Sequence, residues 1–237
     1  MRKILLTASL LFLATVFASA QTSISNVEKM SGWGSCGACA GAGGNGPVVS
    51  YWMHQGVSSP SMDGHASEYH INSGHPYSDV LWWKHLFTGA ANSAAHHFVY
   101  DTYFYTTNPN AWQAVEFDIN QFVNGRSLIF GTQCNVKAGN RWDIWDNVNS
   151  RWVHTGIYCG APAAYKWHHL VIEAERTSTN SLHYIAITLD GARHYINSYW
   201  KSKATSWSGV TVNFQLDGDA QQHPYSVWLN KLTLKYW

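Results

Sequence analysis

The chain has 237 residues, of which 46% are hydrophobic, 15% aromatic and only 12% charged, and its formal net charge is +1. This length fits a single domain, because all-β sandwiches commonly run to about 200–250 residues as one unit. The near-neutral charge, without a basic cluster, argues against nucleic acid or an anionic membrane surface as a partner.

Residues 1–20 have the pattern of a secretory signal peptide. Arg2 and Lys3 precede an apolar run over 4–17, and the segment ends in the small residues A-S-A. The alternative is a membrane anchor, but the apolar run is shorter than the roughly 20 residues that span a bilayer. We therefore expect a protein secreted to the periplasm or the extracellular space, without membrane insertion, in which residues 21–237 form one domain.

Four cysteines are present, at Cys36, Cys39, Cys134 and Cys159. Export to an oxidising compartment favours disulfides over free thiols, and four cysteines allow three pairings. We favour Cys36–Cys39 and Cys134–Cys159. The C-G-A-C spacing also occurs in redox motifs, but its glycine-rich surroundings favour a small structural loop.

Taken in chain order, most of the sequence predicts β-strands rich in aromatic and β-branched residues. A short helix is expected near 80–86, and the Asp190-Gly191 pair is a hairpin signal between two strands. Closely spaced turns and few helical patterns predict an all-β fold, a two-sheet antiparallel β-sandwich with a groove on one outer face. The expected strands cover 97–105, 111–122, 126–135, 167–176, 182–190, 192–199, 209–217 and 225–237.

The segment A-V-E-F-D-I-N-Q-F, residues 114–122, places two carboxylates in an alternating apolar run. Residues two apart in a strand share a face, so Glu116 and Asp118 are expected beside Trp112 on the face opposite the core. Neighbouring like charges raise the pKa of at least one of the two carboxyls. Glycoside hydrolysis uses such a carboxyl pair.

These residues resemble the active strand of laminarinase- and lichenase-type enzymes in the concanavalin A-like lectin/glucanase superfamily, with the motif E-x-D-x-x-E or E-x-D-x-E. The resemblance implies a concanavalin A-like jelly roll, with Glu116 as nucleophile and Asp118 as its supporting acid. The last glutamate of the motif falls on Gln121 or Asn120, and neither amide serves as a general acid. The segment W-H-H-L-V-I-E-A-E-R, at 167–176, further resembles the strand rhythm of laminin-G-like members.

Further groove residues follow from alternation and from aromatic content. Tryptophan stacks on the apolar face of sugar rings, and carboxylates and amides bind hydroxyl groups. On a neighbouring strand, Glu173, Glu175, His168 or His169 could replace the missing acid. The expected sugar-binding residues are Trp112, Gln133, Trp142, Trp145, His169, Glu173, Asn213 and Gln215. The alternative for the carboxylates is an ordinary polar sheet face, and for each tryptophan it is burial.

We expect no cofactor, because the histidines match no metal-binding signature. The superfamily resemblance allows a structural calcium ion, for which D-G-D-A at 217–220 offers oxygen ligands. The favoured function is a secreted, monomeric carbohydrate-binding protein with a groove for a polysaccharide or oligosaccharide. The alternatives are a glycoside hydrolase acting on a β-linked glycan, less favourably a polysaccharide lyase, or a structural surface protein without a ligand.

Overall fold

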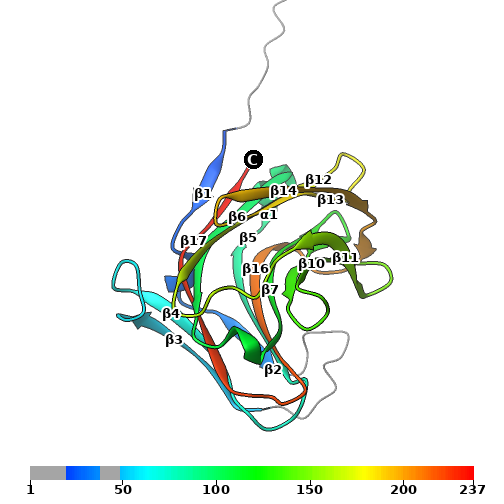
Figure 1. The fold of residues 1–237 in the computed structure, drawn as a ribbon. Helices are drawn as coiled ribbons and strands as arrows, with labels where there is room; N and C mark the ends of the chain where they lie inside the picture. The colour runs from blue at the N-terminus through cyan, green and yellow to red at the C-terminus, as the bar shows by residue number, and fades with distance from the viewer. Residues whose placement is uncertain (1–19, 38–48) are drawn as a thin grey trace, which may run out of the picture.

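The computed structural model describes residues 20–37 and 49–237, which form two antiparallel sheets packed face to face (Figure 1). The predicted two-sheet β-sandwich is therefore confirmed. The predicted signal peptide lies outside the described residues up to position 19, and so does Cys39. In the described part of the chain no helix has both the length and the apolar character needed to span a membrane.

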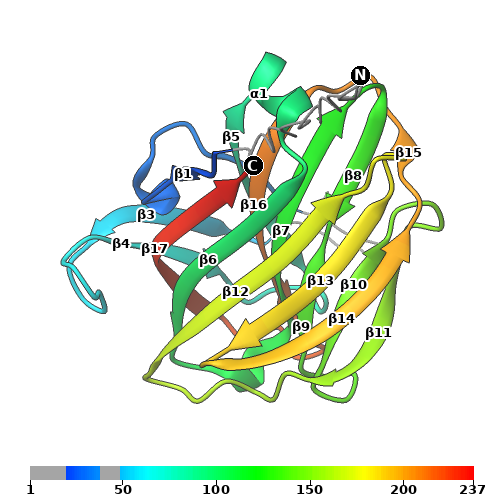
Figure 2. The ribbon, with the colours of Figure 1, turned by 90° about the horizontal axis from the view of Figure 1, so that it is seen from above.

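The first layer, sheet A, has eight strands. Seen from above, β6, β12, β13 and β14 run side by side in front of β7, β8 and β10 of the other layer (Figure 2). Its spatial order is β14 (Ala192–Trp200), β13 (Leu182–Leu189), β12 (Trp167–Arg176), β6 (His97–Thr106), β17 (Tyr225–Tyr236), β4 (Ala66–Ile71) and β3 (Tyr51–Val57), with β1 (Thr22–Ile24) paired to β17.

The second layer, sheet B, has nine strands and carries the strand that the sequence singles out. Its order is β11 (Arg151–Tyr158), β10 (Arg141–Asp146), β9 (Thr132–Asn135), β7 (Trp112–Val123), β16 (Gly209–Gly218), β5 (Asp79–Phe87) and β2 (Gly34–Gly37), with β8 (Arg126–Phe130) paired to both β7 and β15 (Lys203–Ala204). The 12-residue β7 lies in the middle of this sheet.

Helical structure is limited to short segments: α1 (Gly89–Ala94), η1 (Val27–Lys29) and η2 (Pro109–Ala111). The prediction of a short helix near 80–86 is wrong, because this segment belongs to strand β5. Its side chains alternate: Val80 and Trp82 lie in the core, whereas Leu81 and Trp83 face outward from the sandwich. Adjacent tryptophans in one strand thus serve two different surfaces.

The core lies between the sheets and follows from the period-two alternation of the central strands. Val115, Phe117 and Ile119 of β7 all lie in it, together with inward residues of sheet A such as Tyr100 and Leu170. The predicted hairpin is also confirmed, since β13 and β14 pair around Asp190 and Gly191, whose φ angles are 50° and 84°. Two consecutive positive φ angles suit the tight two-residue turn that D-G predicts.

The predicted Cys134–Cys159 disulfide is present. It joins the end of β9 to the residue after β11, across the hairpin that β10 and β11 form. Cys36 lies in β2, and its predicted pairing with Cys39 stays a prediction. The disulfide therefore fixes one wall of the surface described below.

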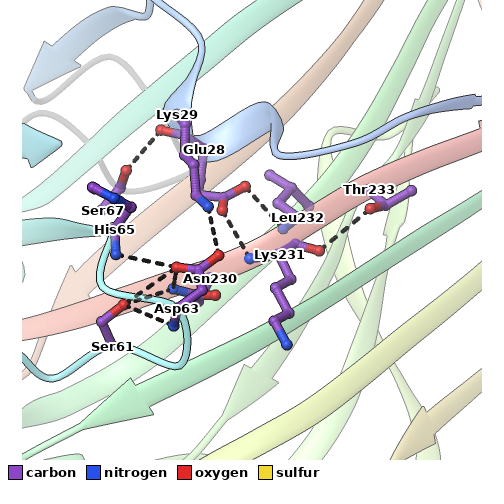
Figure 3. Close-up of polar contacts among 10 residues, drawn as sticks. All are labelled: Glu28, Lys29, Ser61, Asp63, His65, Ser67, Asn230, Lys231, Leu232 and Thr233. Atoms are coloured by element: carbon purple, nitrogen blue, oxygen red, sulfur yellow. Dashed lines mark hydrogen bonds and ion pairs between the residues drawn. The ribbon is translucent and has the colours of Figure 1, made fainter. Parts of the chain in front are cut away.

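Glu28 is a buried carboxylate that connects η1 to the last strand (Figure 3). Its two carboxylate oxygens accept the backbone N–H groups of Lys231 and Leu232 at 2.8 and 2.9 Å. Lys231 has φ 57° and interrupts the pairing of β17 with β6, so its strand neighbours leave these donors unpaired. Ser67 of β4 adds a hydrogen bond to the Glu28 carbonyl oxygen at 2.7 Å.

Replacing Glu28 with leucine should lower the free energy of unfolding by about 2–4 kcal/mol, because two buried N–H groups lose their acceptors. Glu28→Gln keeps one side-chain acceptor oxygen and should cost less. Urea denaturation of both variants measures the difference. A Glu28→Leu variant as stable as the parent protein would show that the irregular segment of β17 at Lys231 and Leu232 does not depend on this carboxylate.

Candidate functional site

Strand pairing in sheet B aligns polar side chains into rows that cross the outer face. One row runs over six strands, because each residue is the register partner of the next: Leu81, Gln215, Glu116, Gln133, Asp143 and His154. Side chains of directly opposed residues lie on the same face of a sheet. Residues far apart in the sequence therefore meet along one line on the outside of the sandwich.

Two further rows flank the first, each displaced by about 7 Å along the strands. One places Asp118 between Asn213 of β16 and the turn at Gly131. A Cβ atom at Gly131 would lie 2.9 Å from the Cβ of Trp145, so a side chain there would displace the tryptophan. The other row brings Asp217 opposite Asp79 and Ala114.

Together the rows form the floor of a groove made of three adjoining hollows with volumes of about 460, 270 and 670 Å³. The first two share Glu116 and Gln215, and the last two share Asn120, Asn213 and others. We call this continuous surface the sheet B groove. Its lining is Tyr77, Asp79, Leu81, Trp83, His85, Gln113, Glu116, Asp118, Asn120, Phe122, Ile129, Gly131, Gln133, Asn135, Asp143, Trp145, Trp152, His154, Trp207, Ser208, Thr211, Asn213, Gln215 and Asp217.

Indole rings stand at the sides of the groove. Trp145 and Trp152 pack edge to face with ring centroids 5.1 Å apart, on the β10–β11 hairpin. Trp207, from the segment after β15, packs against Phe122 and is 68% exposed. Aromatic faces therefore border the polar floor.

Three carboxyl groups lie close together in the floor and are contacted by amides instead of cations. The Gln215 Nε2 atom donates to Glu116 Oε1 at 2.7 Å and to Asp217 Oδ1 at 2.8 Å. The same amide nitrogen therefore holds the carboxyl groups of Glu116 and Asp217 next to each other. The Asp118 Oδ1 atom accepts the backbone N–H of Thr132 at 3.1 Å.

Burial is the main reason that these carboxyls hold their protons. It raises the pKa of Glu116 well above its ordinary value, with further increases from the charges of Asp217 and Asp118. It also raises the pKa of Asp118 to about 8, against an opposing hydrogen bond from Thr132. The pKa of Asp217 rises to about 7, again mainly through burial. The expected increase in at least one carboxyl pKa is therefore present, and it extends to a third carboxyl.

A fixed imidazole forms part of one groove wall. The Nδ1 atom of His154 lies 2.5 Å from Oδ1 of the fully buried Asp143, whose Oδ2 accepts Gln133 and Asn135 side-chain amides at 2.8 and 3.1 Å. Because these contacts hold the carboxylate, they also fix the imidazole ring. The His154 side chain is nevertheless 54% exposed, so part of the ring remains open to solvent.

Several of the predicted site residues come together in the groove. Glu116, Asp118, Gln133, Trp145, Asn213 and Gln215 all line it. Strand β7 therefore presents Glu116 and Asp118 on the same surface. Whether they contact a sugar stays a prediction.

The placement of Trp112 beside Glu116 is wrong. The register between β7 and β16 shifts by one residue at this end of β7, because Trp112 pairs with Gly218 whereas Ala114 pairs with Asp217. The extra residue in β7 turns Trp112 into the core, where it packs near Phe104. Gln113 takes a place in the groove lining instead.

Trp142, His169 and Glu173 are also not in the groove. Trp142 is a core residue, because it shares the inward side of β10 with Ile144. His169 and Glu173 lie on β12 in sheet A, where they contact Asp101 and Arg193 at 2.8 Å. Strand pairing with β6 assigns β12 to the other layer.

None of the four residues proposed to replace the missing acid reaches the groove. Glu175 accepts from His183 on β13, and His168 contacts Asp190, so both pairs belong to sheet A. Gln121, the position of the motif's last glutamate, is fully buried and donates to the backbone of Asn92 and Ala95. The third carboxyl is Asp217, which alternation in β16 places on the outer face.

The segment expected to bind calcium has other contacts. Asp217 lies in the groove, while Asp219 pairs with Lys137 at 3.0 Å and accepts backbone N–H groups of residues 221 and 222. Within residues 20–37 and 49–237, no group of three or more His, Cys, Asp or Glu side chains is arranged to hold a metal ion. The calcium site stays a prediction.

No protein-family model and no curated protein sequence matches the chain. Several solved structures, however, are similar to the chain in fold. The carbohydrate esterase of Shiga toxin-encoding bacteriophage phi24B is 13% identical, with a TM-score of 0.51 over 92% of this chain and 99% of that one. The CBM2 module of the evolved Dit of Lactobacillus casei BL23 phage J-1 is 12% identical, with a TM-score of 0.50 over 92% and 97%.

A third similar structure is arcelin-5, a lectin-like defense protein of Phaseolus vulgaris, with 12% identity and a TM-score of 0.49 over 92% of this chain and 99% of that one. At these identities the likeness concerns the fold.

The raised carboxyl pKa values predict stability that falls as pH rises. A group whose pKa is higher in the folded than in the unfolded protein stabilises most below its unfolded pKa, and this stabilisation is lost as pH passes the folded value. With folded pKa values of about 7 and about 8 for Asp217 and Asp118, the free energy of unfolding should fall by about 4 kcal/mol from pH 6 to pH 9.

Denaturant titrations across this pH range test the prediction. Asp217→Asn and Asp118→Asn should each flatten the profile, because neither asparagine titrates. The half-buried Asp101→Asn, on sheet A, serves as control and should leave the slope unchanged. Equal slopes for all variants would mean that the groove acids are ionised in the folded protein.

Proposed function

We propose that this protein is a secreted glycan-binding protein whose sheet B groove holds a polysaccharide chain. One observation carries the proposal: planar polar side chains form a continuous floor between indole rings. Signal-peptide-like residues at the start of the sequence and the Cys134–Cys159 disulfide support secretion. The monomeric state stays a prediction.

Sugar rings have hydroxyl groups at their edges and C–H groups on their faces. Amide side chains such as Gln133 and Asn213 both donate hydrogen bonds to hydroxyl groups and accept hydrogen bonds from them. A carboxyl such as Glu116 does the same when it is protonated. Indole rings such as Trp207 cover the apolar ring faces. The floor and walls of the groove thus match the two kinds of sugar surface.

The extent of the groove favours a chain over a single sugar. Its lining follows β7 from Gln113 to Phe122, a span of about 30 Å for nine residue steps. This length accommodates several linked sugar units. Two structures of the same fold, described above as a carbohydrate esterase and as a CBM2 module, are consistent with a carbohydrate ligand.

A glycoside hydrolase is the second candidate, and Asp217 is the observation that favours it. The pKa of Glu116 is raised well above its ordinary value and that of Asp217 only to about 7, so the groove contains a protonated acid beside a carboxyl that ionises near neutral pH. The difficulty is that one amide nitrogen, Gln215 Nε2, contacts both carboxyls and holds them side by side, whereas the two carboxyls of a retaining enzyme are about 5 Å apart with the sugar between them. Binding is therefore the leading function.

Affinity electrophoresis in gels containing β-glucans, xylan or galactan tests binding, and reducing-sugar release tests hydrolysis. We expect retardation by at least one polysaccharide without turnover. Turnover that Glu116→Gln and Asp217→Asn both abolish would establish the hydrolase instead. Neither retardation nor turnover with any glycan would contradict both candidates.

Replacing Trp207 with alanine should weaken polysaccharide binding about fivefold or more, because the ring is an exposed aromatic contact at the groove wall. Tyr195→Ala is the matched control, since Tyr195 is 70% exposed but lies on sheet A. Titration calorimetry or gel retardation measures both. Equal losses for the two variants would place binding outside the groove.

A further inference from the structure

Buried carboxyl groups in proteins are normally paired with a cation, because burying an isolated charge is costly. Among the described residues that line the sheet B groove, no lysine or arginine pairs with Glu116 or Asp118. Glu116 is 4% exposed and Asp118 6%, yet Glu116 contacts the Gln215 amide and Asp118 the backbone N–H of Thr132. The folded protein meets this cost by keeping protons on the acids.

The wider groove has the same imbalance. Besides Asp79, its lining contains four carboxyl groups, from Glu116, Asp118, Asp143 and Asp217, and no lysine or arginine among the described residues. The sequence of residues 38–48 contains no lysine or arginine either. Of the two histidines in the lining, His154 is already paired with Asp143.

Unpartnered acceptors in the same floor give a second, independent observation. The Oδ1 atom of Asn120 and the Oε1 atom of Gln215 are buried without a hydrogen-bond partner, in side chains of residues only 6% and 2% exposed. Both residues line the hollow that contains Glu116 and Asp118. Buried acceptors without donors are costly, so a ligand rich in N–H donors would satisfy them.

We propose that the groove selects glycans with free amino groups, in which a sugar ammonium group sits over Glu116, Asp118 and Asp217. This inference rests on the proposed glycan-binding function and names the class of glycan. An ammonium group is a compact cation with three N–H donors and no acceptor, which matches a site that has acceptors and negative charge. Its charge replaces the protons that the acids otherwise keep.

The same chemistry disfavours uronic-acid polymers. A bound uronate would bring a further carboxylate toward Glu116 and Asp217 without a lysine or arginine in the described lining to neutralise it. A polysaccharide lyase needs such neutralisation. The groove therefore separates amino sugars from acidic sugars by charge.

Three β-1,4-linked hexamers of equal length test the inference, because they differ at C2 alone: glucosamine, N-acetylglucosamine and glucose. Calorimetry at pH 6 should show the glucosamine hexamer binding about tenfold or more tightly than either neutral hexamer, as expected for a charge-assisted contact. Binding should release protons, so the measured heat should change with the ionisation enthalpy of the buffer. Added salt should reduce the preference.

Variants assign the preference to the groove. Glu116→Gln and Asp217→Asn should each remove most of the preference, so that the glucosamine hexamer binds the variant about as tightly as the two neutral hexamers bind that same variant. Glu173→Gln removes a carboxylate from the outer face of sheet A and should leave the preference unchanged, which excludes a general attraction of surface carboxylates for a polycation.

The outcomes separate this inference from the function on which it rests. The amino-sugar inference is overturned, and glycan binding left intact, if the glucosamine hexamer binds no more tightly than the neutral hexamers. The same holds if the glucosamine hexamer does not bind at all while a neutral polysaccharide retards the protein. Failure of every glycan, charged or neutral, in both assays overturns both. An amine preference that Glu173→Gln abolishes and Glu116→Gln does not would also contradict the groove site.

Discussion

The strict alternation of β7 is the constraint on which the rest of the structure depends. Because successive side chains of a strand point to opposite faces, the strand that buries Val115, Phe117 and Ile119 must present Glu116 and Asp118 on its other side. Pairing with β16 and β9 then sets Gln215 and Gln133 beside Glu116. The hydrophobic core and the polar groove are therefore two consequences of one register, and a slip by one residue would destroy both.

The groove is chemically unusual because it is deep and acidic at the same time. Burial and mutual repulsion keep protons on Glu116, Asp118 and Asp217, so the floor both donates and accepts hydrogen bonds near neutral pH. The β10–β11 hairpin adds the edge-to-face pair of Trp145 and Trp152, and the nearby disulfide anchors the ends of that hairpin. A rigid wall beside a protonated floor suits recognition of hydroxyl- or amine-bearing rings more than it suits an acid pair that must flank a bond to be cleaved.

Period-two patterns were sufficient to predict the sandwich, the outward position of Glu116 and Asp118, and the Asp190-Gly191 hairpin. They failed where the pattern is locally broken or where assignment to a layer matters. The bulge that turns Trp112 inward has no signal in the sequence, and no local pattern shows that His169 and Glu173 belong to the other sheet. Trp142 and Trp145 lie three apart, an odd number, so alternation could have excluded one of them. Asp217 was on the predicted outer face, but its meeting with Glu116 depends on strand pairing.

The most direct test of the groove as a glycan site is a crystal structure of the mature protein with a bound oligosaccharide. We expect sugar rings in the sheet B groove, above Glu116 and Gln215 and beside Trp152 and Trp207. A chain bound on the outer face of sheet A, around Tyr195 or His169, with the groove left to water alone, would contradict this assignment.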